Sequence, residues 1–132
     1  MKKGQSMAEF ALILGVFLFI LLGTFEWGMF IYSVSGVSNA ARGTARKIVV
    51  LENLTNVTTA AKAEIFNQSG PLPVLVRNKI AESTSVHLSS ATKPEYITIR
   101  ITDLPYKPIT GFNVFLPKTI STEATMRYER NE

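Results

Sequence analysis

The longest hydrophobic stretch of the chain lies near its N-terminal end. Residues 10–25 carry no charge, and Thr24 is the only one of them with a polar side chain. A helix of this length measures about 24 Å, and an extension to Tyr32, which takes in Glu26, gives enough length to span a bilayer with some tilt. The pattern therefore predicts one membrane-spanning helix over about residues 10–32.

The helical pattern continues past this stretch, because residues 33–51 contain no proline. One face presents apolar side chains at helical spacing, namely Val34, Val37, Ala41, Ala45 and Ile48. A second strip of small residues, Gly36, Ala40 and Gly43, would let another backbone pack closely against the helix. We expect one continuous helix over residues 5–51. The alternative is a break near Gly36 or Gly43, since glycine weakens helices.

Residues 52–132 predict a small α+β head. A short helix is expected within residues 59–68, presenting Ala61, Ile65 and Phe66. Apolar and polar positions then alternate with a period of two, which predicts antiparallel strands near residues 83–90, 95–103 and 119–129. The apolar face of such a sheet must be covered, and the apolar face of the long helix is the available cover.

The residues that precede the hydrophobic stretch restrict what this helix can be. A secretory signal peptide also begins with basic residues, here Lys2 and Lys3, but its apolar region is shorter and ends in a small-x-small cleavage site. A plain signal anchor explains the length and leaves Glu9 unexplained, because an acid at the mouth of an inserted helix costs a few kcal/mol. Glu9 is therefore a candidate functional residue.

The run GQSMAEF, residues 4–10, resembles the cleavage region of type IV prepilins. The resemblance implies that prepilin peptidase removes residues 1–4 as a leader by cutting between Gly4 and Gln5. Glu9, followed by Phe10, then becomes the fifth residue of the mature chain. The new α-amine of Gln5 is mostly cationic at neutral pH, so Glu9 of one subunit can pair with the amine of its neighbour. Such a pair in apolar surroundings sets the register of packed helices.

Three further stretches narrow the resemblance to the TadE-like pseudopilins of tight-adherence (Flp) pili. They are the pair Glu26 and Gly28, the run NAARGTAR at residues 39–46, and the closing run ISTEATMRYE at residues 120–129. Two departures are the leader of only four residues and Gln5 in place of the phenylalanine of better-known pilins, which leaves N-methylation open. Glu26 is interpreted as a residue at the membrane–water interface. The second interpretation is that it pairs with a partner subunit.

The resemblance implies a pilin-like architecture and a single-pass protein of the bacterial inner membrane with its head in the periplasm. The partners it implies are other pilins, prepilin peptidase, the inner-membrane pilus assembly platform and the lipid bilayer. A minor pilin or pseudopilin is the favoured role, and incorporation into the surface pilus is left open. The alternatives are a major pilus subunit and a bitopic membrane protein with a periplasmic binding or enzymatic head.

Composition restricts the chemistry. The chain has no cysteine, which excludes thiol catalysis, disulfides and thiolate metal sites, and its net charge of +4 is too mild and scattered for a nucleic-acid partner. The single histidine, His87, falls on the polar side of a predicted strand. Asp103 is the only aspartate, and no carboxylate pair or Gly-rich phosphate loop accompanies it. We therefore expect no enzyme, metal or cofactor. Tyr106, Phe112 and Phe115, in a proline-bounded loop, are expected to pack within the head or to contact another pilin.

Overall fold

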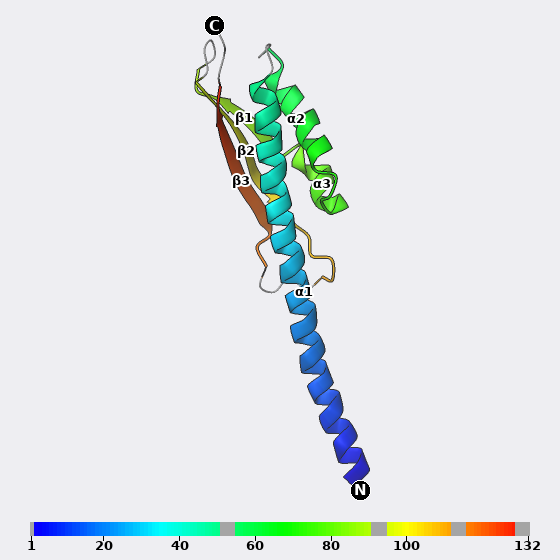
Figure 1. Cartoon of the computed structure of the whole chain (residues 1–132). Coiled ribbons are helices and arrows are strands. Elements are labelled where there is room, and N and C mark those ends of the chain that lie inside the picture. The colour runs from blue at the N-terminus through cyan, green and yellow to red at the C-terminus, as the bar shows by residue number, and fades with distance from the viewer. Residues whose placement is uncertain (1, 51–54, 91–94, 112–115, 129–132) are drawn as a thin grey trace.

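The computed structural model describes residues 2–50, 55–90, 95–111 and 116–128, with side chains described from Gly4 onward. Its elements are α1 (Lys2–Val49), α2 (Val57–Gln68), α3 (Val74–Ile80), β1 (Thr84–Leu88), β2 (Tyr96–Pro105) and β3 (Thr119–Arg127). Helix α1 is a long rod, and the other elements form a head along its C-terminal half (Figure 1). The predicted α+β architecture, a long N-terminal helix packed on a small antiparallel sheet, is confirmed.

Helix α1 is unbroken at both Gly36 and Gly43. Its N-terminal part stands free of the head, and Glu26 is the first side chain along it to be buried. The free part, residues 4–25, measures about 33 Å at 1.5 Å per residue. That length is close to the thickness of the hydrocarbon core of a bilayer, about 30 Å.

The sheet is antiparallel with the order β1-β2-β3. Strand β2 is rich in β-branched residues, which favour strands, and it pairs with β1 from Ile97 opposite Leu88 to Ile101 opposite Thr84. The strands lie close to the predicted ranges, but β2 continues to Pro105, two residues farther than expected, and β3 ends at Arg127. The last predicted strand residue, Glu129, lies outside the described residues.

The core lies between one face of the sheet and the helices. Helix α1 contacts β2 and β3, while α2 contacts α1 and β1. From α1 the core takes Val37, Ala41, Ala45 and Ile48, and from β2 it takes Ile97, Ile99, Ile101 and Leu104. Val34 packs against this cluster and is partly buried. The predicted apolar face of the long helix is therefore the cover of the sheet.

The strip of small residues on α1 receives side chains from the end of α2 and from the segment that follows it. A Cβ atom at Gly36 would clash with Leu72 Cδ2, and one at Gly43 would lie 3.1 Å from Gln68 Oε1. Ala40, between them, is buried. At Gly36 and Gly43 the close approach is therefore made within the chain, by the side chains of Leu72 and Gln68.

The prediction for the short helix was wrong at Phe66. Val57, Ala61 and Ile65 are the buried residues of α2 at a spacing of four, so the next residue is rotated by about 100° away from the core. The Phe66 side chain is 39% exposed, and the guanidinium carbon of Arg77 lies 4.6 Å from its ring centroid. This cation–π contact joins α2 to α3 at the surface.

A bulge interrupts the pairing of β2 with β3. Ile101 lies opposite Thr122 and Leu104 opposite Ile120, so two residues of β2 face Ser121 alone. One of the two, Asp103, has a φ of 51° and donates its backbone N–H to Ser121 Oγ at 3.1 Å. A left-handed backbone tolerates aspartate or glycine and disfavours β-branched residues.

We therefore expect Asp103→Val to lower the free energy of unfolding by about 1–2 kcal/mol, because it forces a branched side chain into this conformation. Asp103→Gly, which removes the same carboxylate, is expected to change it by less than about 0.5 kcal/mol. Denaturant unfolding of the detergent-solubilised chain measures both variants. Equal losses in the two would show that the carboxylate, and not the backbone, matters at this position.

Candidate functional site

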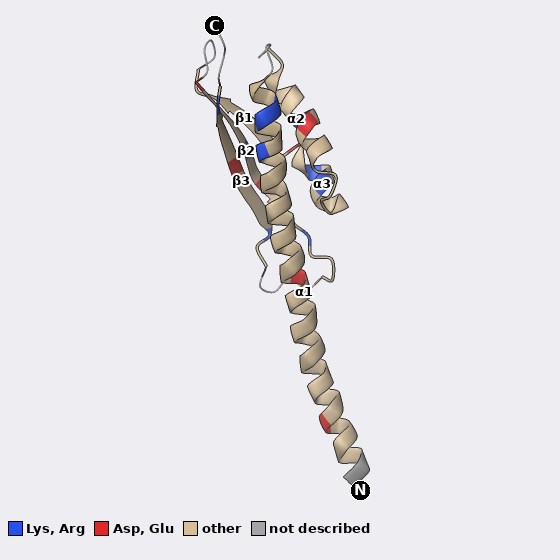
Figure 2. Cartoon of the chain, viewed as in Figure 1, with Lys and Arg blue, Asp and Glu red and all other residues tan. Residues whose placement is uncertain are grey.

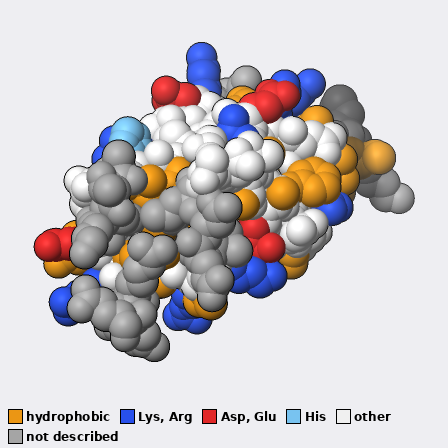
Figure 3. Space-filling view, turned by 90° about the horizontal axis from the view of Figure 1, so that it is seen from above, with side chains coloured by type: hydrophobic (Ala, Val, Ile, Leu, Met, Phe, Trp, Pro, Cys, Tyr) orange, Lys and Arg blue, Asp and Glu red, His pale blue; other side chains and the backbone are white. Residues whose placement is uncertain are grey.

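The free part of α1 presents hydrophobic side chains on all its sides. Within the described residues α1 is the one helix long and apolar enough to cross a membrane, and its apolar window is not buried by the head. Residues 10–25 of this segment carry no charge, and an acidic residue precedes them at Glu9 and follows them at Glu26 (Figure 2). By contrast, a view from above shows Lys, Arg, Asp and Glu side chains around the outline of the molecule (Figure 3). The arrangement is that of a single-pass membrane anchor with a hydrated head.

Glu9 lies near the start of this free segment and is exposed. The side-chain nitrogen Nε2 of Gln5 donates to Glu9 Oε1 at 3.2 Å, one helical turn away. Phe10 is exposed beside it, and the Gly4–Gln5 bond lies in the first turn of α1. The N–H groups of a first turn have no acceptor within the helix, so this turn unwinds more readily than the turns after it.

Glu26, at the other end of the free segment, is 1% exposed and bound by the loop that follows β2. Its Oε1 accepts the backbone N–H of Ile109 at 2.7 Å, and its Oε2 accepts the backbone N–H of Thr110 at 3.1 Å. The Thr110 hydroxyl donates to Oε2 at 2.7 Å and the Tyr106 hydroxyl to Oε1 at 3.4 Å. We call these contacts of Glu26 with residues 106–110 the Glu26 clamp.

An aromatic cluster surrounds the clamp. The ring of Phe30 makes edge-to-face contacts with Tyr106, at 5.1 Å between centroids, and with Trp27, at 6.0 Å. Tyr106 is 7% exposed, so of the two expectations for this side chain, packing within the head is the one realised. Burial and the neighbouring Glu26 carboxylate raise the pKa of the Tyr106 phenol, which keeps it a neutral donor. Phe112 and Phe115 lie outside the described residues.

Sequence reasoning identified Glu26 but not the residues that bind it. Ile109 and Thr110 follow Glu26 by 83 and 84 positions, and they act mainly through backbone groups that every residue except proline carries. The signal available was the acid itself, because a carboxylate among apolar residues requires hydrogen-bond donors. The structure supplies those donors from within the chain.

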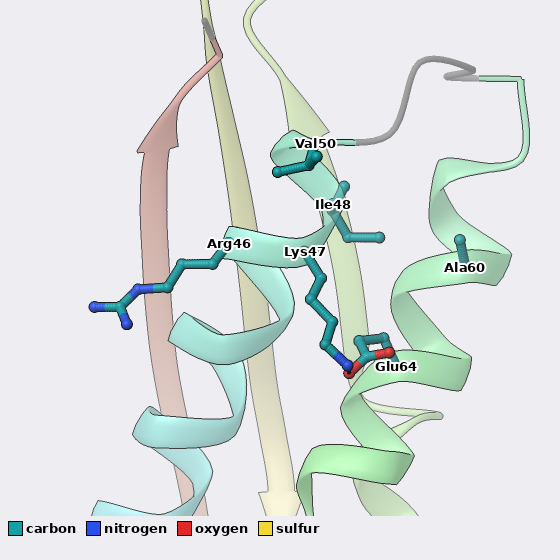
Figure 4. Close-up of a pocket in the computed structure, with 6 residues that line it drawn as sticks. All are labelled: Arg46, Lys47, Ile48, Val50, Ala60 and Glu64. Carbon is teal, nitrogen blue, oxygen red and sulfur yellow. Dashed lines mark ion pairs between the residues drawn. The ribbon is translucent and has the colours of Figure 1, made fainter.

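An open hollow of about 520 Å³ lies near the C-terminal end of α1, between it and α2 (Figure 4). Lys47 reaches across it to Glu64, with 2.6 Å between Nζ and Oε1, whereas Arg46 points away toward β3. The hydrogen bond from Lys47, with a second from Gln68, holds the pKa of the Glu64 carboxyl below its usual value near 4.5. One ion pair among alkyl side chains orients α2 on α1 and provides no reactive group.

This ion pair predicts a pH dependence of stability. The pKa of Glu64 is lower in the folded chain, so the pair stabilises above the unfolded pKa of about 4.5 and the stabilisation is lost as pH falls through the folded value. Lys47 is 60% exposed, so we expect well under 1 kcal/mol. The difference in unfolding free energy between the wild type and Glu64→Gln should be constant near neutral pH and should disappear in acid. A difference that stays unchanged once Glu64 is fully protonated would contradict this assignment.

His87 is exposed, and the described residues contain no group of three or more His, Cys, Asp or Glu side chains that could hold a metal ion. The candidate functional site therefore consists of the free helix, the Gln5–Glu9 turn at its start and the Glu26 clamp where it enters the head. The free helix can pack against lipid or other helices, Glu9 can pair with a cation, and the Glu26 clamp orients the head on α1.

Residues 4–46 match the family model described as TadE-like protein, which confirms the resemblance over this stretch of the chain. No curated protein and no solved structure matches the chain. The matched stretch contains the Gly4–Gln5 bond, Glu9, the free helix and Glu26.

Proposed function

We propose that this chain is a minor pilin or pseudopilin, processed by prepilin peptidase and involved in assembling tight-adherence pili. One observation carries the proposal. The TadE-like match covers residues 4–46, and this stretch contains both the prepilin-like motif and residues 4–25 of α1, which the head leaves uncovered. A hydrophobic helix that stands free over about 33 Å needs a lipid or protein environment. A pilin has lipid around this helix before assembly and other pilin helices around it afterwards.

The proposed mechanism begins at the membrane. Cleavage after Gly4 on the cytoplasmic side removes Lys2 and Lys3 and leaves a cationic amine on Gln5, while the helix stays in the bilayer and the head lies in the periplasm. Glu9 then pairs with the amine of a neighbouring pilin as the helices pack. The assembly platform of the inner membrane is the proposed site of this packing.

Two alternatives differ in what they predict. A major pilus subunit predicts that deleting the chain removes all surface pili, whereas a minor subunit predicts fewer pili or altered ones. A bitopic membrane protein with a binding or enzymatic head predicts a chain that keeps its N-terminus and has no effect on pili. Counting pili in a deletion strain distinguishes these roles.

Processing is the most direct test of the proposal. Intact-mass analysis of the chain extracted from membranes should show the loss of residues 1–4, with Gln5 as the new N-terminus. Gly4→Leu, which enlarges the residue before the cut, is expected to leave the full-length mass, while Gly15→Leu, farther along the free helix, should be processed as the wild type is. A wild-type chain that retains Met1 in cells with an active prepilin peptidase would overturn the proposed function.

A further inference from the structure

We propose that the loop held by the Glu26 clamp, residues 106–111, is a lipid-binding surface by which the head rests on the bilayer. The proposal rests on the membrane insertion of α1 that the proposed function includes. The occupant we assign to this surface is the headgroup layer of the leaflet that faces the head. The contact would fix the orientation of α1 and the head relative to the membrane surface.

The level of the loop along α1 is the first argument. The span expected from the sequence, residues 10–32, would place Glu26 inside the hydrocarbon core. The head begins at Glu26, however, and the uncovered residues 4–25 are about as long as the core is thick, so a span over residues 4–25 places Glu26 at the headgroup level. The backbone nitrogens of Ile109 and Thr110 lie 2.7 Å and 3.1 Å from its carboxylate oxygens. The loop descends beside α1 from the end of β2 (Figure 1), so it lies at this same level.

The chemistry of the exposed side chains at this level is the second argument. Ile109 is 58% exposed although its backbone is held by Glu26, and Lys107 is also exposed. Trp27 and Phe25, both exposed on α1, complete a set of apolar and aromatic side chains with one cation. Aromatic side chains accumulate at membrane interfaces, and lysine binds the phosphates of anionic lipids there.

The clamp explains why the loop stays at this level. Two backbone N–H groups and a hydroxyl are bound to one buried carboxylate, and Gly111 next to them has a φ of 78°, a backbone conformation that favours glycine. Moving the loop away from α1 would leave the buried Glu26 carboxylate without these donors, which is costly. The loop therefore presents Ile109 and Lys107 as a fixed surface.

Depth-dependent quenching tests the proposal on the full chain, because the sequence contains no cysteine. Ile109→Cys carries an environment-sensitive fluorophore and leaves the clamp intact, since residue 109 contributes its backbone N–H. The chain is reconstituted in vesicles of phosphatidylcholine and phosphatidylglycerol with brominated acyl chains. Ile20→Cys, within the free helix, reports insertion. His87→Cys reports water, because His87 is exposed and lies opposite Thr98 near the start of β2, whereas the loop follows the end of β2.

We expect brominated lipid to quench the label at Ile109 and to shift its emission to shorter wavelength, while the label at His87 is unchanged. Adding Glu26→Gln should reduce the quenching at Ile109, because the loop is then released. Quenching at Ile20 without quenching at Ile109 would overturn this inference and leave the proposed function standing. Absence of quenching at Ile20 would overturn both. Quenching at Ile109 that disappears as the protein-to-lipid ratio rises would assign the loop to a second copy of the chain and overturn lipid as its occupant.

Discussion

Replacing Glu26 by alanine is expected to lower the free energy of unfolding of the head by about 2–4 kcal/mol. The substitution leaves the backbone N–H groups of Ile109 and Thr110 without their acceptor. Each buried donor without a partner costs about 1–3 kcal/mol, and water reaching the partly exposed loop recovers some of that loss. Glu26→Gln should cost nearly as much, because two carboxylate oxygens each accept a backbone N–H and an amide offers only one oxygen.

Denaturant unfolding of the full chain in detergent measures this loss. Trp27 is the sole tryptophan and lies next to Glu26 in sequence, so its fluorescence reports the clamp directly. Glu123→Ala is the matched control, because it also removes a glutamate, but one that is exposed and pairs with Arg100 at 3.2 Å. That control should cost less than about 1 kcal/mol. Equal effects at Glu26 and Glu123 would mean that the clamp does not stabilise the head.

The extended elements of the fold were predictable because each rests on a repeating pattern. Helix α1 follows from apolar residues that recur without a proline, and the buried faces of Val37, Ala41 and Ile48 follow from the helical period. Strand β2 follows from its alternation, in which Ile97, Ile99 and Ile101 fall on one side. A periodic signal fixes which face is inward before any partner is known.

The contacts that hold the head on the helix were not predictable in the same way. The clamp joins one side chain to backbone groups of a loop, and the small-residue strip at Gly36 and Gly43 receives single side chains, Leu72 and Gln68, from a distant segment. Neither contact repeats along the chain, so no period reveals it. What the sequence does contain is the requirement: an acid in an apolar stretch needs donors, and glycines in a helix leave space.

Replacing Glu9 by alanine is expected to leave the chain in the membrane and to abolish most of its assembly with other pilins. Insertion becomes easier, because a carboxylate at the mouth of the helix costs a few kcal/mol and alanine does not. Assembly loses a partner for the amine of the neighbouring Gln5. Breaking an ion pair in apolar surroundings costs about 3–5 kcal/mol, which corresponds to a fall of more than about a hundredfold in the affinity of one pilin for the next.

The geometry at the start of α1 offers a competing role for Glu9, and the same experiment separates the two. In the structure its carboxylate accepts from Gln5 of its own chain at 3.2 Å, so it could serve only its own helix, a contribution of a few tenths of a kcal/mol. Surface pili are counted in cells with Glu9→Ala, with Glu9→Asp, which keeps the charge, and with the exposed head variant Glu123→Ala. Intact mass verifies that each variant is cleaved. Normal pili from a cleaved and inserted Glu9→Ala chain would assign this carboxylate to its own helix, because a pair between subunits cannot be lost without weakening their packing.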